Sequence, residues 1–178
     1  MQHLQTTPVG LSFVVQEIQK TLYTELGTLW GDILDGYGLV YHINENNIVS
    51  PQAFVGGKND YSGNLMTTDK SKFFFTKQTK AVHLGDDSFK TSVNLFFIVN
   101  LAKAKASILH RAESEVLADV LNTLKNCHTD GVKDTTDKLD EVLREFSNLY
   151  KKSRIENMHP HYIFKTNIDL VYNINQKC

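Results

Sequence analysis

The first residues whose types and spacing could do chemistry are two histidines on either side of a proline, His159 and His161. Two imidazoles placed two residues apart before a strand could share a metal ion, with His128 or Asp130 as a third ligand. The sequence has no Cys-x-x-Cys pair, no His-Glu-x-x-His pattern and no carboxylate triad to complete such a site. We therefore expect no metal here and interpret both histidines as exposed residues ahead of a strand.

A thiol and an imidazole that are adjacent in the chain, Cys127 and His128, could form a nucleophile with its general base. Neighbouring residues on a helix point about 100° apart, so they rarely meet in the hydrogen bond that this chemistry requires. We expect the thiol of Cys127 to pack at the end of a helix instead.

The glycines form no phosphate-binding loop. The four between residues 27 and 38 lack Gly-x-Gly-x-x-Gly spacing, and Gly56-Gly57-Lys58 lacks the gap and the Ser or Thr of a Walker loop. The sequence therefore predicts no catalytic residue, no cofactor and no metal, and we expect a protein that is not an enzyme.

Composition places the chain among ordinary globular proteins. Its 178 residues are 41% hydrophobic and 22% charged, and 19 basic against 20 acidic side chains give a net charge of −1. This predicts a single domain over residues 1–178 with no strong field for nucleic acid or lipid. The longest apolar run, Leu95 to Val99, is far shorter than the ~20 residues of a membrane helix, and the start lacks the pattern of a signal peptide. We expect no membrane association and free thiols in a reducing cytoplasm.

The elements that must position any site begin with a helix. Thr7 suits the cap, Pro8 suits the first helical position, and Gly31 suits the end. The apolar residues between them recur at steps of three and four and form one stripe: Leu11, Val14, Val15, Ile18, Leu22, Leu26 and Leu29.

The middle of the chain is rich in strand patterns. Alternation over residues 37–43 predicts a strand, and the turn residues 44–47 predict a hairpin into a second strand over Ile48–Val55. Pro51 lacks a backbone donor, which predicts an edge position or a break. A long polar loop is expected from Gly56 to about Lys72, followed by a short strand over residues 73–75.

A strand from Thr91 to about Leu101 is apolar on both faces, which predicts that this chain or a neighbouring copy covers both. Two helices follow. The first carries the stripe Val116, Leu117, Val120, Leu121 and Leu124; the second begins at Asp134 or Thr135 and carries Leu139, Val142, Leu143, Phe146 and Tyr150.

The last element alternates with a period of two for about thirteen residues from Tyr162, or roughly 43 Å. A folded domain of this size is only about 40 Å across, so we expect the strand to overrun its own sheet. Its free backbone groups then need a partner, which another copy of the chain can supply. The alternative is a bent strand or one broken by a bulge near Asn167.

These elements predict an α+β domain: an N-terminal helix, a mainly antiparallel sheet of about four to five strands, two helices packed on it, and a long C-terminal strand. The side chains expected at contacts between subunits are Tyr61, Phe96, Ile98, Phe164, Ile168, Leu170 and Tyr172.

The chain also resembles a family: the small neck and tail ring proteins of tailed bacteriophages, of the head–tail connector or tail-terminator type, as in crAss-like and other phages of Bacteroidota. The resemblance is carried by motifs spread over most of the chain. They are Tyr37-Gly38-x-x-Tyr41, Pro51-Gln52-Ala53-Phe54-Val55-Gly56-Gly57, Asn59-Asp60-Tyr61, residues 94–101, His110-Arg111-Ala112-Glu113 and the strand after His159-Pro160-His161. The stretch from Asn122 to Thr136 matches nothing in the family.

The resemblance implies a structural virion protein, made in the host cytoplasm, whose copies form a homo-oligomeric ring around the DNA channel. It implies contacts with other neck, portal and tail proteins, and DNA that passes through without sequence-specific binding. The alternative from the residues is an intracellular module, monomeric or dimeric, that binds a protein or a small ligand in an apolar pocket beneath the helices.

Overall fold

A computed structural model describes residues 1–31, 34–45, 48–58, 60–62, 70–107, 112–142, 144 and 160–175 of the chain. Its main sheet combines parallel and antiparallel pairs in the order β1-β2-β6-β8-β10-β9, with β7 also paired to β8. The strands are β1 (Gln2–His3), β2 (Leu34–Leu39), β6 (Ser71–Lys77), β7 (Val82–Gly85), β8 (Ser88–Asn100), β9 (Val132–Thr136) and β10 (His161–Asn173). The pairs β1–β2 and β2–β6 are parallel, and the others are antiparallel. The α+β class is therefore confirmed, with a mixed sheet that has more strands than predicted.

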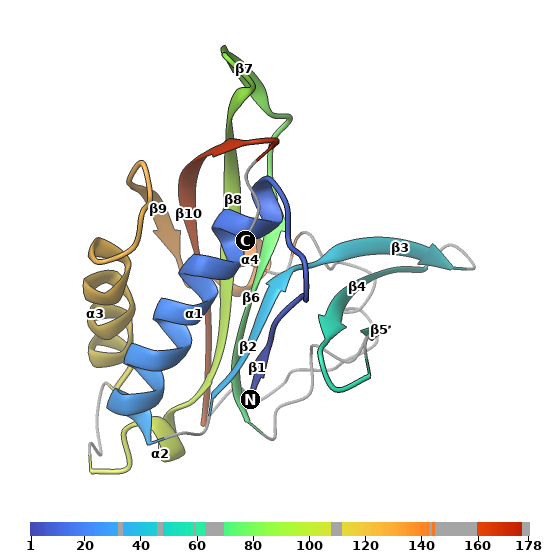
Figure 1. Cartoon of the computed structure of the whole chain (residues 1–178). Coiled ribbons are helices and arrows are strands. Elements are labelled where there is room, and N and C mark those ends of the chain that lie inside the picture. The colour runs from blue at the N-terminus through green and yellow to red at the C-terminus, as the bar shows by residue number, and fades with distance from the viewer. Residues whose placement is uncertain are drawn as a thin grey trace.

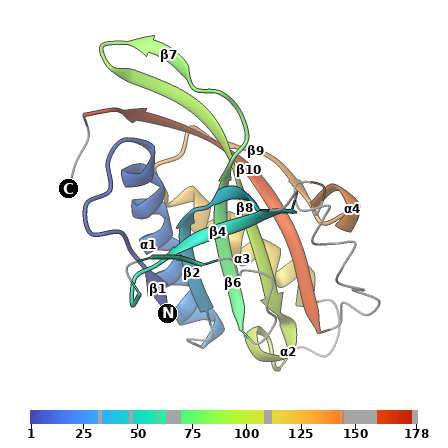
Figure 2. The same cartoon turned by 90° about the vertical axis from the view of Figure 1, so that its right-hand side faces the viewer.

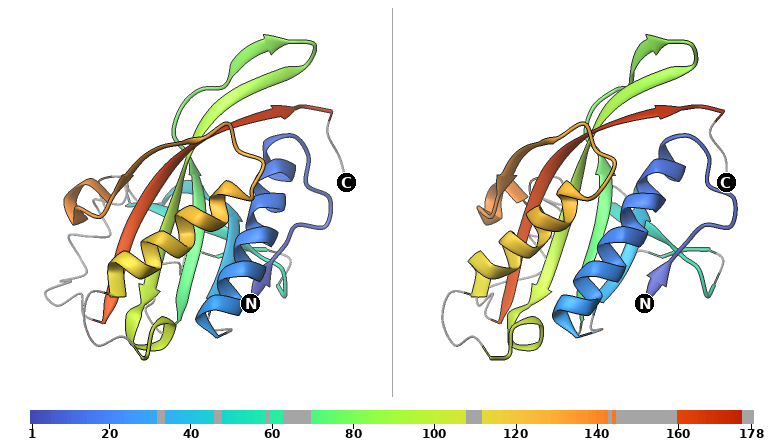
Figure 3. Two further views of the ribbon diagram at one scale, coloured as in Figure 1. Left: turned by 90° about the vertical axis from the view of Figure 1, so that its left-hand side faces the viewer. Right: turned by 60° about the vertical axis from the view of Figure 1, so that its left-hand side comes forward.

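Helices cover one face of this sheet. They are α1 (Leu11–Trp30), α2 (Leu101–Ala104) and α3 (Ala112–Lys125), and α1 and α3 lie side by side across the strands (Figures 1 and 3). Near the other face lie α4 (Leu139–Val142) and a second, three-stranded sheet of β3 (Tyr41–Glu45), β4 (Ile48–Val55) and β5 (Asp60–Ser62) (Figure 2). The main sheet is thus the middle layer of the molecule.

The first helix begins later than its sequence pattern predicts. Gly10, at φ 55°, is the residue before the first helical turn, so Thr7 and Pro8 lie ahead of the helix. A positive φ turns the chain at little cost only in glycine, and this sets the start at Leu11. The end is as predicted: Gly31, at φ 72°, donates its N–H to the carbonyl of Gly27.

The strand expected over residues 37–43 is two strands in different sheets. β2 ends at Leu39 within the main sheet, and β3 starts at Tyr41 within the smaller one. Between them Val40 is buried and donates its N–H to the carbonyl of Phe75. The break arises because β6 holds Val40, a contact that local alternation does not encode.

The predicted hairpin is confirmed, since β3 and β4 pair antiparallel from Tyr41↔Gln52 to Glu45↔Ile48. β4 runs unbroken through Pro51. β5 pairs with residues 53–55, so among the described residues the missing donor falls where β4 has β3 as its one partner. The loop expected over residues 56–72 contains β5 and the start of β6; residues 63–69 lie outside the described ranges.

The two-sided strand is confirmed as β8, and this chain covers both of its faces. Side chains of one parity (Val93, Leu95, Phe97 and Val99) pack in the main core with α1 and α3. Those of the other parity, Phe96 and Ile98, pack in a second cluster with Val40, Ala53, Phe74, Val142 and Ile163. No neighbouring copy is needed to bury them.

The second helix predicted after β8 is wrong at its start, because residues 132–136 form β9 instead of a helical turn. The β-branched Val132, Thr135 and Thr136 suit a strand, and Thr135 and Thr166 share a side-chain hydrogen bond of 2.9 Å across to β10. Leu139–Val142 is helical, as α4, and Leu143, Phe146 and Tyr150 lie outside the described residues.

The expectation that β10 is too long for its own chain is also wrong. All thirteen of its residues pair with β8, from His161↔Asn100 to Asn173↔Ser88. β8 is equally long, so every residue of β10 has a partner on that edge, and on the other edge β9 pairs with Lys165 to Ile168. The register shift between Asn167 and Ile168 affects only the pairing with β9: Asn167 pairs with Asp134 and Ile168 with Val132, so the extra residue is Lys133 of β9 and β10 has no break.

Candidate functional site

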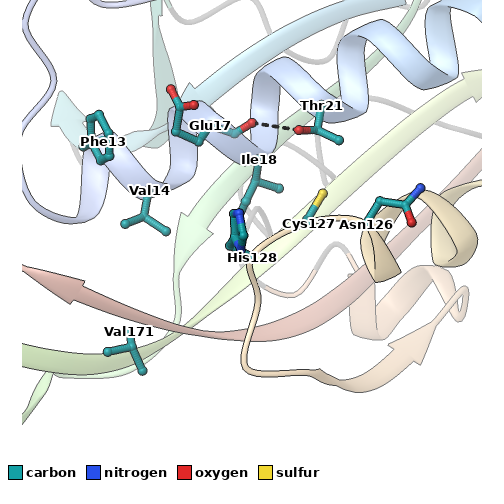
Figure 4. Close-up of a pocket in the computed structure, with 9 residues that line it drawn as sticks. All are labelled: Phe13, Val14, Glu17, Ile18, Thr21, Asn126, Cys127, His128 and Val171. Carbon is teal, nitrogen blue, oxygen red and sulfur yellow. Dashed lines mark hydrogen bonds between the residues drawn. The ribbon is translucent and has the colours of Figure 1, made fainter. Parts of the chain in front are cut away.

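A cavity of about 390 Å³ lies between α1 and the segment that follows α3 (Figure 4). Its lining mixes apolar and polar side chains, namely Phe13, Val14, Glu17, Ile18, Thr21, Asn126, Cys127, His128 and Val171. This is where the structure places the Cys127–His128 pair that the sequence singles out.

The chemistry of this pair does not suit catalysis. Burial, with the nearby charge of Glu25, raises the pKa of the Cys127 thiol to about 11. The thiol donates a hydrogen bond to the backbone carbonyl of Thr123 at 3.5 Å. A thiol that stays protonated at neutral pH is neither a strong nucleophile nor a metal ligand. Cys127 is therefore a packing residue at the end of α3.

Of the histidines considered as metal ligands, the structure describes His128 and His161. His159 lies outside the described residues. Within the ranges that the structure describes, no group of three His, Cys, Asp or Glu side chains could hold a metal ion. The structure therefore offers no described metal centre at His128, Asp130 or His161.

A network of charges joins β8, β9 and β10 around Asp169, which sequence reasoning missed. The carboxylate of Asp169 lies 2.7 Å from the ammonium of Lys133 and 3.2 Å from that of Lys90, and it accepts a hydrogen bond from Ser92 at 2.6 Å. Lys90 also pairs with Asp130. Burial alone would raise the pKa of Asp169, but the hydrogen bonds from Lys133, Ser92 and Lys90 outweigh it and lower the pKa to about 2.

The network is structural in character, because its two lysines neutralise a buried carboxylate and fix β9 on β10. Ser92 and Asp169 are 77 residues apart in the sequence, so no local sequence pattern indicates that they meet. In the sequence Asp169 alternates with apolar residues just as Lys165 and Asn167 do, so the local pattern gave no sign that this carboxylate is buried.

Most of the predicted interface side chains lie in the core of the single chain. Phe96, Ile98, Phe164, Ile168 and Leu170 are each at most 2% exposed, so they have no surface to offer a neighbour. Their selection as interface residues is thereby corrected. These positions are apolar because the same chain covers them, with α1 and α3 on one face of the sheet and with α4 and the second sheet on the other.

The other two predicted interface residues reach the surface. Tyr61 is 37% exposed and packs edge-on against Tyr41 and Phe54. Tyr172 is half-buried and stacks on Phe89 with ring centroids 5.8 Å apart. The structure does not bring Tyr61 and Tyr172 together, since they belong to different sheets.

The most prominent surface feature is an arm that projects beyond the helices (Figures 1 and 3). We define the arm as residues 82–90, which form the β7–β8 hairpin, together with residues 171–175 at the end of β10. Its exposed aliphatic side chains are Val82, Leu84, Val171 and Ile174, at 62%, 55%, 45% and 48% exposure. Among the described residues, β7 pairs only with β8, so its outer edge is open.

Hydrogen bonds make the arm a defined structure. Gly85, Asp86 and Asp87 turn the hairpin with φ of 107°, 47° and 61°. Ile174 donates its N–H to the carbonyl of Asp87 at 3.2 Å, and the amide of Asn175 donates to the Asp87 carboxylate at 2.8 Å. The end of β10 is thus fastened to the tip of the hairpin.

None of the helices in the described part of the chain has the length and apolar character to cross a membrane. Comparisons with protein-family models, curated proteins and solved structures found no match. The fold and surface define the class, an α+β protein with a layered mixed sheet and a projecting arm. What the protein does is inferred from these residues.

Proposed function

We propose that this chain is a structural subunit that assembles with copies of itself. Following the resemblance, the assembly is a ring-forming head–tail connector or tail-terminator protein in the neck of a tailed-phage virion. The observation that carries self-assembly is the arm, because it presents an open strand edge and four exposed aliphatic side chains.

The arm has the physical character of a contact surface. An open edge strand can take a strand from another chain, and exposed aliphatic groups on either side add buried apolar area when it does. Val82 and Leu84 are 62% and 55% exposed, and together they would gain roughly 2–3.5 kcal/mol from full burial. Because Asp87 is fastened to the end of β10, little conformational freedom is lost on docking.

A ring follows when the arm of each subunit meets a different surface of the next, so that the contact is heterologous and closes by rotation. The nearly balanced charge, −1 overall, suits a channel that lets DNA pass without specific binding. The proposal includes other neck, portal and tail proteins as partners, synthesis in the host cytoplasm, and a final location in the virion.

The test is a double substitution on the arm, Val82→Asp with Leu84→Asp. We expect wild-type protein to sediment as an oligomer and the double variant to sediment as a monomer, with the same circular dichroism. Loss of burial at both positions weakens each contact by a factor of roughly 30 or more. The matched control is Leu29→Asp on α1, which is 52% exposed and outside the arm, and which should assemble normally. Electron microscopy then shows whether the oligomer is a closed ring.

Two results contradict the proposal: a wild-type chain that stays monomeric at a concentration of about 0.5 mM, where contacts with Kd near 1 mM become visible, or a double variant that assembles like Leu29→Asp. A strict monomer would favour the second candidate, a binding module. The observation behind that candidate is the cavity under α1, where Phe13, Val14 and Ile18 supply an apolar wall (Figure 4).

A further inference from the structure

The sheet face opposite α1 and α3 changes from apolar to polar along its strands. Beyond the apolar cluster of Phe96 and Ile98, one row of directly paired residues crosses four strands and is polar throughout. The row consists of Thr76 on β6, Asn94 on β8, Asn167 on β10 and Asp134 on β9. Residues directly opposite one another in paired strands share a face, so this row forms a polar floor.

A cavity of about 490 Å³ lies over this floor, on the side of the sheet that Figure 2 presents. Its lining is polar in every position: Gln78, Asn94, Asp134, Thr136, Glu141, Arg144, Lys165 and Asn167. The volume falls in the range of small-molecule sites, about 300–1,000 Å³.

The amide of Asn167 is held in one orientation. Its nitrogen donates to the backbone carbonyl of Val93 at 3.3 Å, to the side-chain oxygen of Asn94 at 3.0 Å and to the side-chain oxygen of Gln78. Because a backbone carbonyl only accepts, the nitrogen must face Val93, and the two ends of the amide cannot be exchanged. Within the described residues, the Asn167 oxygen accepts no hydrogen bond and the Gln78 side-chain nitrogen donates none.

Two opposite charges around the cavity act on described neighbours only at longer range, Arg144 on Glu141 and Asp134 on Lys138. Neither the guanidinium of Arg144 nor the carboxylate of Asp134 makes a side-chain hydrogen bond or ion pair with a described residue. Glu141 differs, since Lys138 lies 3.2 Å away and Thr136 donates to it at 3.1 Å. These hydrogen bonds, with the nearby charge of Arg144, lower the pKa of Glu141. Besides Glu141 and Lys165, whose ammonium lies over the ring of Phe96, the cavity therefore offers one cation (Arg144), one anion (Asp134), one fixed acceptor and one donor.

We propose that this cavity binds a small zwitterion, a free amino acid. The ligand carboxylate pairs with Arg144 and accepts from Gln78, while its ammonium group meets the Asp134 carboxylate and the Asn167 oxygen. A guanidinium binds a carboxylate through two parallel hydrogen bonds, which makes Arg144 the main anchor. The site lies on the sheet face and does not depend on self-assembly through the arm.

The experiment is a nuclear magnetic resonance titration of the full ¹⁵N-labelled chain with the twenty standard amino acids, first pooled and then singly, each up to about 10 mM. We expect shifts of the side-chain amide signals of Asn167 and Gln78. The exposed substitutions Arg144→Gln and Asp134→Asn should each weaken binding roughly tenfold or more. The charge-matched control Lys125→Gln, outside the cavity, should bind like wild type.

Derivatives of the amino acid that binds separate a zwitterion site from a plain anion site. The N-acetylated form lacks the ammonium group and the carboxamide form lacks the carboxylate, so each should bind at least about tenfold more weakly. The proposal is overturned if none of the twenty amino acids moves the Asn167 and Gln78 signals. It is equally overturned if the N-acetylated form or inorganic phosphate binds as tightly, or if Arg144→Gln binds like Lys125→Gln.

Discussion

Replacing Asp169 with asparagine removes the negative charge that holds β8, β9 and β10 together, while leaving the shape of the side chain. Asp169 is 4% exposed, and its carboxylate lies 2.7 Å from the ammonium of Lys133 and 3.2 Å from that of Lys90. In the variant both lysines lose their shared partner and Ser92 donates to a weaker acceptor.

The magnitude follows from the pKa of the carboxyl group. The network lowers it from 3.8 to about 2, which corresponds to roughly 2.4 kcal/mol of stabilisation of the ionised form. The side chains of Lys133 and Lys90 are 54% and 37% exposed, so water screens their attraction. We therefore expect Asp169→Asn to reduce the free energy of unfolding by about 1–2 kcal/mol at pH 7.

The lowered pKa of Asp169 also determines how its stabilising effect changes with pH. A carboxyl group whose pKa is lower in the folded state leaves the unfolded chain with more bound protons between the two pKa values. Its stabilisation is complete above the unfolded pKa of 3.8 and is lost as the pH falls toward about 2. The deficit of the variant should thus be constant from pH 7 to about pH 5 and shrink below about pH 4.

Urea unfolding at several pH values, followed by circular dichroism, measures both quantities. Asp140→Asn, at an exposed carboxylate on α4, is the control and should change stability by less than about 0.5 kcal/mol. A deficit that is absent at pH 7, or that stays the same size at pH 3, would refute the assignment of the stabilisation to the charge of Asp169.

Three further outcomes are expected. Iodoacetamide should modify Cys127 slowly at pH 8 and faster toward pH 11, as followed by peptide mass spectrometry, because burial keeps the thiol protonated; rapid modification at pH 8 would contradict this. Gly36→Ala should cost about 1–3 kcal/mol in thermal unfolding, since its Cβ would lie 2.7 Å from the ring of buried Phe73, whereas Gly57→Ala has open space and should cost little; equal effects would count against this packing. Leu170→Asp should unfold the isolated chain, because the new charge is buried and unpaired and lowers the free energy of unfolding by about 3 kcal/mol or more. A folded, monomeric variant would show that Leu170 is not buried within the chain.

The sequence predicted those elements whose pattern is local. The alternation of β8 separated the main core from the second cluster, because residues two apart in a strand share a face whatever the strand pairs with. The same reasoning placed Gly31 at the end of α1, since a left-handed residue there closes the helix within one turn.

Elements decided by distant pairing were missed. The β-branched residues 132–136 lie directly before the helical spacing of Leu139 and Val142, so the local pattern extended the helix backwards. Pairing with β10, about thirty residues later in the chain, makes this segment a strand. The Asp169 network was hidden for the same reason, because the register of β8, β9 and β10 brings its partners together.

The surface proposed for assembly is the arm instead of β10 alone, and the reason is physical. The predicted strand from Thr91 was too short for β10, and the missing stretch, residues 88–90, is the one that pairs with residues 171–173. Because β8 extends to Ser88, it pairs with one edge of β10 as far as Asn173. The ends of both strands therefore project beyond the helices (Figure 1). The turn at Asp86 and Asp87 joins β8 to the strand that precedes it, β7, whose outer edge has no partner among the described residues and which exposes Val82 and Leu84. Within the described residues, the open edge at the arm is therefore that of β7, whereas β10 pairs with β8 over all thirteen of its residues.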